Sequence, residues 1–332
     1  MKIVVISEPS TLKLMDVDSR ALVPHELRVS VAVSAVCGSD LKIIAQPSRP
    51  GIQTPGHEFA GKVIESYDGK TLLGERVTAF PMFSCLECEP CIHRNYRDCD
   101  YKHSLGYDLQ GSFAEEVIID ERFAVRLYDE ISYEEGALVE HLCCGLRLAK
   151  EAEKLLKQYD RILVVGDGPI ALADLRFLKM RGFHNIVLVG KHSERMTFAM
   201  RLGARKAIRF DELVHSPLDG ELFDALIFSV HDNRVIDHLF QWLNKGGKVF
   251  PQTRLSEEYM AQLADKSGAT FGRAFAYHID DFQEVMQLIV SGEIRVDELI
   301  SSRIRLSDVD KAVPLLFSKK GIKTLITSDR CA

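Results

Sequence analysis

The most constraining feature of the sequence is a glycine-rich turn between a short apolar run and a helical pattern. The apolar run Arg161–Val165 leads into the string GDGPIA at residues 166–171. In this strand–turn–helix context, Gly166 permits a tight turn and Gly168 lets the backbone approach a pyrophosphate. Pro169 costs no hydrogen bond in a first helical turn, where free N–H groups would face the phosphates. The segment therefore predicts a dinucleotide-binding βα unit.

The residues around this turn alternate between short apolar runs and helical stretches. Runs that are apolar on both faces are typical of strands in a parallel sheet that helices cover. We expect strands at 161–165, 185–189, 224–230 and 247–251, and helices at 143–159, 169–181, 194–202 and 234–243. The pattern predicts a doubly wound parallel sheet. A further helix is expected at 280–290, and an extended segment at 323–327.

The first part of the chain contains a series of short strand patterns. From Leu27 to Ala35 apolar residues occupy every second position, and this half-buried pattern leads directly to Cys37. Many short strands with turn signals favour a small β-barrel. The other strands are expected at 59–66, 76–80, 112–119 and 123–127. The length of 332 residues is enough for about two domains of roughly 150 residues.

The composition excludes several classes of protein. Apolar residues make up 46% and charged residues 27%, which is typical of a globular chain and not of a disordered one. The net charge of −6 argues against a nucleic-acid binder, which would need a basic excess. No apolar run reaches the roughly 18 residues of a membrane span, and the start MKIVVISEPS lacks the pattern of a signal peptide. We therefore expect a cytoplasmic protein with no membrane or nucleic-acid partner.

Four of the eight cysteines lie in one polar segment. Without a secretion signal, cysteines indicate metal binding or catalysis rather than disulfides. The spacing C-x2-C-x2-C-x7-C joins Cys85, Cys88, Cys91 and Cys99. Such a segment cannot fold by burying its own apolar surface, whereas four thiolates around Zn²⁺ would contribute on the order of 10 kcal/mol. We predict a structural zinc with no open ligand position, although four cysteines can also hold an iron–sulfur cluster.

A second group of potential metal ligands is dispersed along the chain. Cys37 begins the string CGSD, His57 lies in the string GHE, and Glu140 follows much later. Cysteine, histidine and carboxylate are all zinc ligands, but each of these residues taken alone is equally compatible with a structural role.

In their order along the chain, these motifs resemble the zinc-containing medium-chain alcohol/polyol dehydrogenases, a family that includes sorbitol and threonine dehydrogenases. The resemblance covers nearly the whole chain and extends to the strings GSFAE at 111–115 and GG at 246–247. It implies a homodimer or homotetramer. The domains that it implies are a GroES-like β-barrel catalytic domain at 1–145 with a zinc lobe at 84–100, a Rossmann dinucleotide-binding domain at 146–278, and a return of the chain to the catalytic domain at 279–332.

The resemblance assigns the catalytic metal ligands residue by residue. It gives Cys37, His57 and Glu140 as ligands of a catalytic zinc, and Glu58 as an adjacent carboxylate that binds the metal in some members. With the structural zinc of the lobe, this makes two zinc ions per chain. When bound, the catalytic zinc is a Lewis acid that lowers the pKa of an alcohol or polarises a carbonyl, so that hydride passes to or from the nicotinamide.

Three further residues near Cys37 receive roles from the same resemblance. Ser39 matches the hydroxyl that receives the proton of the substrate alcohol. Asp40 matches the carboxylate that orients the ligand histidine. Many relatives have a histidine in place of Lys42 and pass protons to solvent through it. Lys42 either takes over this role with a lowered pKa or is a solvated surface lysine.

The end of the second strand of the dinucleotide-binding domain bears on the choice of cofactor. NAD-dependent enzymes usually place an acid there to bind the ribose 2′-hydroxyl, whereas this chain has Gly190 followed by cations. A 2′-phosphate fits this pattern better, so we predict that NADP(H) is preferred over NAD(H). The predicted cofactor-binding residues are Gly166, Asp167, Gly168, Pro169, Ile170, Gly190, Lys191, His192 and Arg195.

The leading hypothesis is a zinc-dependent oxidoreductase that transfers a hydride between NADP(H) and a secondary alcohol or ketone of a polyol, sugar or cyclitol. The strand end at Gly190 also resembles that of alditol-phosphate reductases, for which Lys42 is a candidate phosphate ligand. Such relatives usually lack the four-cysteine lobe. The alternative from another class is a non-catalytic zinc- and nucleotide-binding sensor, but the intact set of catalytic residues favours an enzyme.

Overall fold

The chain forms two compact units in the computed structural model, which describes residues 1–47, 53–213, 220–230, 232–273 and 277–329. The first unit contains Met1–Glu140 and His278–Ala332, and the second contains His141–Tyr277. No helix within the described ranges is both long enough and apolar enough to cross a membrane.

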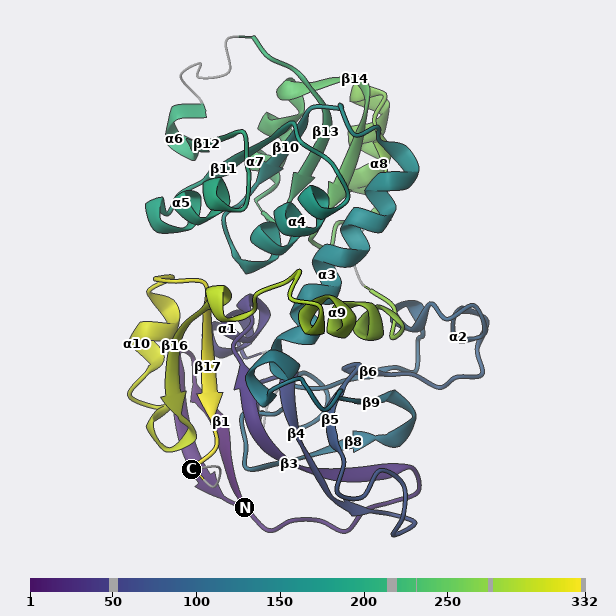
Figure 1. The fold of residues 1–332 in the computed structure, drawn as a ribbon, viewed down its shortest axis with the longest axis vertical. Helices are drawn as coiled ribbons and strands as arrows, with labels where there is room; N and C mark the ends of the chain where they lie inside the picture. Colours follow the sequence, from purple (N-terminus) through teal and green to yellow (C-terminus); the bar gives the residue numbers. More distant parts are fainter. Residues whose placement is uncertain (48–52, 214–219, 231, 274–276, 330–332) are drawn as a thin grey trace. The chain divides into compact units, whose positions relative to one another are not determined.

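A seven-stranded sheet forms the centre of the first unit (Figure 1). The strand order is β16-β17-β3-β4-β5-β9, and β8 also pairs with β3. All pairs are antiparallel except the parallel pair β16–β17. The strands are β3 (Glu26–Ala35), β4 (Glu58–Ser66), β5 (Arg76–Ala79), β8 (Glu116–Asp120), β9 (Ala124–Arg126), β16 (Ile300–Arg305) and β17 (Lys323–Thr327). The predicted extended segment at 323–327 is confirmed as β17.

Strand β3 is buried more completely than its alternating pattern predicts. Only Glu26 and Ser30 are half-buried, and all other positions are buried. Arg28 forms an ion pair with Glu65, with 2.7 Å between Nε and Oε2. Ser34 donates a hydrogen bond of 2.7 Å to the carbonyl oxygen of Ser112. Partners for these polar side chains on neighbouring segments allow both faces of β3 to leave water.

The chain termini supply a second apolar layer of the first unit. The hairpin β1 (Lys2–Glu8) and β2 (Thr11–Asp16) joins α1 (Gly38–Ala45) and α10 (Val313–Phe317) in one buried cluster. The sequence analysis predicted none of these elements. Helix α9 (Asp281–Val290), in contrast, is confirmed within a residue of its predicted start.

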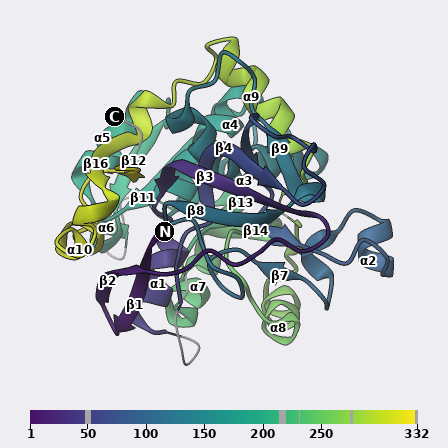
Figure 2. The ribbon, with the colours of Figure 1, turned by 90° about the horizontal axis from the view of Figure 1, so that it is seen from below.

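The cysteine-rich segment forms a small lobe of the first unit. Its elements are β6 (Met82–Phe83), α2 (Glu89–Ile92) and β7 (His103–Ser104). In both views the part of the lobe that carries α2 projects from the rest of its unit (Figure 1, Figure 2).

A six-stranded, all-parallel sheet forms the second unit, which confirms the predicted doubly wound sheet. The strand order is β12-β11-β10-β13-β14-β15, so the winding reverses at β10. The strands are β10 (Ile162–Val165), β11 (Ile186–Gly190), β12 (Lys206–Arg209), β13 (Phe223–Phe228), β14 (Leu243–Pro251) and β15 (Thr270–Phe271). The helices are α4 (Pro169–Met180), α5 (Ser193–Arg201), α6 (Phe210–Leu213), α7 (Asn233–Leu239) and α8 (Glu257–Ser267). Ligands of such sheets bind beyond the carboxyl ends of the strands near the reversal.

Helix α3 (Tyr133–Leu155) begins ten residues before the predicted start at Cys143. Gly136 lies at the end of its first turn, and glycine favours a helix less than alanine does. A Cβ at this glycine would lie 2.6 Å from a Leu127 methyl group and 3.0 Å from Ala60 Cβ, so close packing of the helix explains the residue. As a result, Glu140 lies on a helix and not in a loop.

Candidate metal centres and cofactor site

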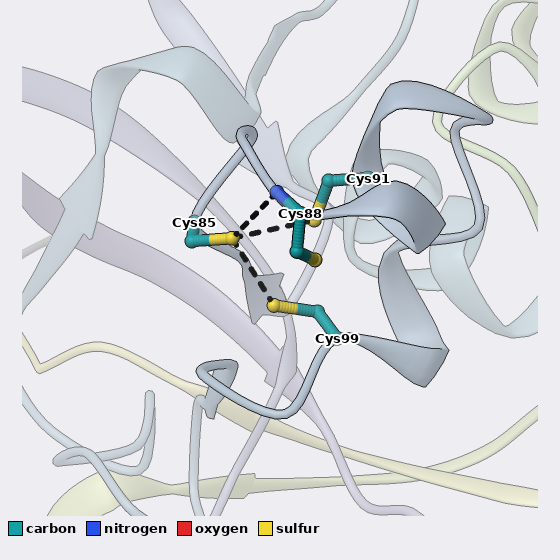
Figure 3. Close-up of side chains that lie close together, drawn as sticks. All are labelled: Cys85, Cys88, Cys91 and Cys99. Atoms are coloured by element: carbon teal, nitrogen blue, oxygen red, sulfur yellow. Dashed lines mark hydrogen bonds between the residues drawn. The ribbon is translucent and has the colours of Figure 1, made fainter.

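The four cysteines of the lobe lie together (Figure 3). Their sulfur atoms are all within 4.8 Å of one another. The Sγ atom of Cys85 is 3.9 Å from that of Cys91 and 3.6 Å from that of Cys99. The backbone N–H of Cys88 points at Cys85 Sγ, 3.4 Å away. Four sulfurs at this spacing fit a tetrahedral ion.

The backbone of the lobe favours a thiolate at its first cysteine. Leu86 adopts a left-handed conformation with a φ of 66°, which turns the chain immediately after Cys85. Hydrogen bonds from the backbone of Glu87 and Cys88 lower the pKa of Cys85 to about 6. Burial and the neighbouring thiols raise the pKa of Cys91 to about 12. The site is therefore poised to take a cation, which would deprotonate the remaining thiols.

Replacing Cys91 with alanine is expected to lower the zinc content by about one ion per chain and to open residues 84–100. The lobe has few apolar side chains, so a metal would contribute on the order of 10 kcal/mol to its folding. Metal analysis and amide hydrogen exchange in the lobe measure the two effects. Replacement of Cys144, a half-buried cysteine on α3, is the matched control and should change neither. Full metal content in the Cys91 variant would contradict the assignment.

A second group of metal ligands is brought together by the pairing of β3 with β4. In the antiparallel register Ala35 lies opposite Glu58, so Cys37, which follows β3, meets the residues that begin β4. Ligand atoms of Cys37, His57 and Glu58 all lie within 4.8 Å of one another. Glu140, the fourth predicted ligand, is buried but does not belong to this cluster of three.

Asp40 connects the two segments that carry these ligands. Its fully buried carboxylate accepts hydrogen bonds from the backbone N–H groups of Cys37 at 2.8 Å and Gly56 at 3.0 Å. Its Oδ1 atom is 3.4 Å from Nδ1 of His57. Gly56 has a φ of 103°, and a Cβ there would lie 2.5 Å from the ring of Phe113. Asp40 therefore ties the start of α1 to the segment before His57, and its orienting role toward His57 stays a prediction.

The electrostatics of His57 also fit a metal ligand. Burial lowers the pKa of His57, but Asp40 and Cys37 raise it more, so that the net pKa lies well above its usual value. A histidine must be neutral to bind a metal, so ion binding here would release a proton.

Lys323 is a residue beside the candidate site that the sequence analysis missed. This lysine begins β17, is 1% exposed, and donates to both carboxylate oxygens of Glu58, at 2.6 and 2.5 Å. Burial alone would lower the pKa of Lys323, but Glu58, with Cys37 and Glu140 nearby, raises it above the usual value. In the sequence, the only indication of this role is a lysine at the first position of a strand whose other residues are uncharged.

Ser39, Lys42 and Tyr107 complete the surroundings of this cluster. The hydroxyl oxygen of Ser39 is buried and lies beside the phenol of Tyr107. The Tyr107 ring centroid is 6.1 Å from that of His57, and burial raises the pKa of its phenol. Lys42 is exposed on α1, and partial burial of its ammonium lowers its pKa. Tyr107 was not predicted, because the sequence around it carries no motif for a role in chemistry.

The glycine-rich turn of the second unit has the conformation that a dinucleotide requires. Gly166 has a φ of 127° and donates its N–H to the carbonyl of Val189 at 2.8 Å. Gly168 is the N-cap of α4, and a Cβ there would meet nothing within 4 Å. Open space at the start of a helix is where a pyrophosphate binds. Pro169 and Ile170 form the first turn of α4 behind it.

The remaining predicted cofactor residues surround Asp167, the residue between the two glycines. Its Oδ2 atom accepts hydrogen bonds from the backbone N–H groups of Lys191 at 2.7 Å and His192 at 2.6 Å. The His192 ring nitrogen Nδ1 is 3.0 Å from the same oxygen. Arg195 is buried, which lowers its pKa, while the charge of Asp167 raises it by less.

Comparisons with known proteins agree with both units. The family "Alcohol dehydrogenase GroES-like domain" matches residues 23–129. A probable D-xylulose reductase A of Neosartorya fischeri is 28% identical over 326 residues, covering 91% of this chain and 89% of the relative. A D-arabitol-phosphate dehydrogenase of Enterococcus avium is 28% identical over 320 residues, with coverage of 91% and 89%. A short chain alcohol dehydrogenase of Escherichia coli CFT073, solved with NADH, has a TM-score of 0.86 at 23% identity and covers 98% of this chain and 99% of that one.

The fold and these similarities define an NAD(P)-linked oxidoreductase built from a GroES-like domain and a Rossmann domain. More narrowly, the relatives support the zinc-containing medium-chain alcohol/polyol dehydrogenase family for this chain. The predicted family, fold class and enzyme class are therefore confirmed.

Proposed function

We propose that this oxidoreductase transfers a hydride between a nicotinamide dinucleotide and a secondary alcohol or ketone of a polyol, sugar or cyclitol. The observation that carries the proposal is the convergence of Cys37, His57 and a carboxylate, with Asp40 joining the two segments that bear them. The relatives named D-xylulose reductase and D-arabitol-phosphate dehydrogenase support a polyhydroxylated substrate.

The donor groups of the first unit fit two zinc ions per chain. The four lobe cysteines would hold a structural ion. Cys37 and His57 would hold the catalytic ion. Glu140 is the third ligand that the family resemblance assigns, whereas the carboxylate within 4.8 Å of both residues is that of Glu58. When bound, the ion supplies Lewis acidity toward a substrate oxygen. Lys323 engages both oxygens of Glu58, so we assign Glu58 a charge-balancing role beside the ion rather than direct ligation.

Ser39 is the group that we propose to exchange a proton with the substrate hydroxyl. Its oxygen is buried on the first turn of α1, two residues after Cys37, so it is held close to the metal ligands. Asp40, on the same turn, fixes the orientation of His57. Lys42 lies one turn further along and is the candidate for passing the proton to solvent, since partial burial of its ammonium lowers its pKa.

A phosphorylated alditol is the second candidate substrate. The Enterococcus avium relative is named for such a substrate, and Lys42 offers an exposed cation on the helix that carries Ser39. The assembly into dimers or tetramers stays a prediction.

A cofactor-reduction screen tests the proposed function. Zinc-supplied protein should reduce NAD⁺ or NADP⁺ with at least one alditol, ketose partner, alditol phosphate or cyclitol, and prolonged chelation should abolish the activity. Each free alditol is paired with its phosphate, so that the ratio of kcat/KM values identifies the substrate class. A fully metal-loaded protein that reduces neither cofactor with any member of the panel would rule the proposal out.

A further inference from the structure

Two features at the end of β11 fit together as a pair. Gly190 ends this strand, at the position where NAD-dependent enzymes usually carry an acid. A Cβ at Gly190 would lie 2.8 Å from both Cβ and Oδ2 of Asp167. The space that a side chain at position 190 would occupy is therefore filled by the carboxylate of Asp167, which comes from the glycine-rich turn.

The carboxylate of Asp167 is held rigidly in this position. Its Oδ2 atom accepts hydrogen bonds from the backbone N–H groups of Lys191 and His192, at 2.7 and 2.6 Å. Burial raises the pKa of Asp167, but the hydrogen bonds from His192 and Lys191 lower it more, so the group stays ionised. Its Oδ1 atom receives only the 3.1 Å contact from His192 Nδ1 among the described residues. A carboxylate oxygen has room for a second donor.

The cations that the sequence offers to a 2′-phosphate are engaged elsewhere. The His192 ring lies against Asp167. The ammonium of Lys191 is 5.2 Å from the ring centroid of Phe210. Arg195 is buried, which lowers its pKa, and it faces the charge of Asp167. The two backbone N–H groups that could cradle a phosphate are already bound to Asp167, so a phosphate here would meet a carboxylate instead of free donors.

We propose that Asp167 accepts a hydrogen bond from the adenosine ribose and excludes a 2′-phosphate, so that the enzyme selects NAD(H) over NADP(H). Asp167 thereby replaces the acid missing from position 190. This inference rests on the proposed function, and it reverses the NADP(H) preference that we predicted from sequence. The reversal arises because the sequence pattern shows which residue ends β11 but not which side chain fills the space beside it.

Fluorescence titration of the metal-loaded protein with NADH and NADPH tests the proposal without turnover. The wild type should bind NADH at least about tenfold more tightly than NADPH, the discrimination expected of a charged hydrogen bond. In Asp167→Asn this ratio should fall about tenfold or more. In Lys191→Ala the ratio should stay unchanged, whereas a site that uses Lys191 for a 2′-phosphate would lose affinity for NADPH.

A double variant that moves the acid from the turn to the strand end controls for damage to the turn. Asp167→Gly combined with Gly190→Asp returns the acid to the strand end and should keep the preference for NADH. Three outcomes would each overturn the inference and leave the dehydrogenase assignment intact. These are wild-type protein that binds NADPH as tightly as NADH, an unchanged ratio of affinities in Asp167→Asn, and a double variant that prefers NADPH. Protein that binds neither nucleotide would overturn both.

Discussion

Replacing Cys37 with alanine is expected to abolish hydride transfer while the fold stays intact. The side chain of Cys37 is half-buried and follows β3, so its loss removes little packing. It does remove one of the three side chains whose ligand atoms converge at the start of β4. Lewis-acid stabilisation of a transition state is worth several kcal/mol, so kcat/KM should fall by about a thousandfold or more.

Metal content and folding distinguish this outcome from simple unfolding. The variant should lose about one of two zinc ions, because the four cysteines of the lobe are untouched. Its circular dichroism and its NADH affinity should match those of the wild type, since the residues predicted to bind the cofactor all lie in the second unit. Activity that survives the substitution would show that the catalytic site lies elsewhere in the chain.

The elements that the sequence predicted are those with strong local patterns. The bounds of β3, the apolar runs of β10 and β11, and the start of α4 at Pro169 all match the structure within two residues. Helix α8 was missed although Ser256 caps its start and Gly268 ends it with a φ of 68°. The hairpin of β1 and β2 was missed because its stability depends on burial against α1 and α10, which no local pattern shows.

The candidate site likewise contains residues that local motifs predict and residues that only folding brings together. Cys37, His57 and Asp40 could be predicted because each lies in a short motif, and the pairing of β3 with β4 brings the motifs together. Lys323 could not be predicted, since it reaches Glu58 across 265 residues of chain. The role of Asp167 likewise depends on a contact with Gly190 that only the folded turn creates. The proposed metal ligands lie in short sequence motifs, whereas the residues that balance their charge come from distant parts of the chain.

Replacing Lys323 with methionine is expected to destabilise the central sheet of the first unit strongly. Lys323 and Glu58 are both almost completely buried, and the ammonium bridges both carboxylate oxygens. Removal of one partner leaves the carboxylate buried without compensation, which costs about 3–5 kcal/mol in such pairs. β17 and β4 flank β3 in the same sheet, so the loss should appear as faster hydrogen exchange in these strands and as a lower denaturation midpoint.

A second substitution separates the charge effect from the loss of packing. Lys323→Met combined with Glu58→Met removes both charges and should recover most of the lost stability, because apolar replacement of a buried ion pair is often nearly neutral. Lys311→Met is the matched control, since Lys311 pairs with Asp308 at 2.8 Å but is 75% exposed, and it should leave the denaturation midpoint almost unchanged. The double variant should still lose activity if Glu58 and Lys323 balance charge beside a catalytic ion. If the double variant is as unstable as Lys323→Met alone, the lysine stabilises the sheet through packing, and Glu58 requires no charged partner.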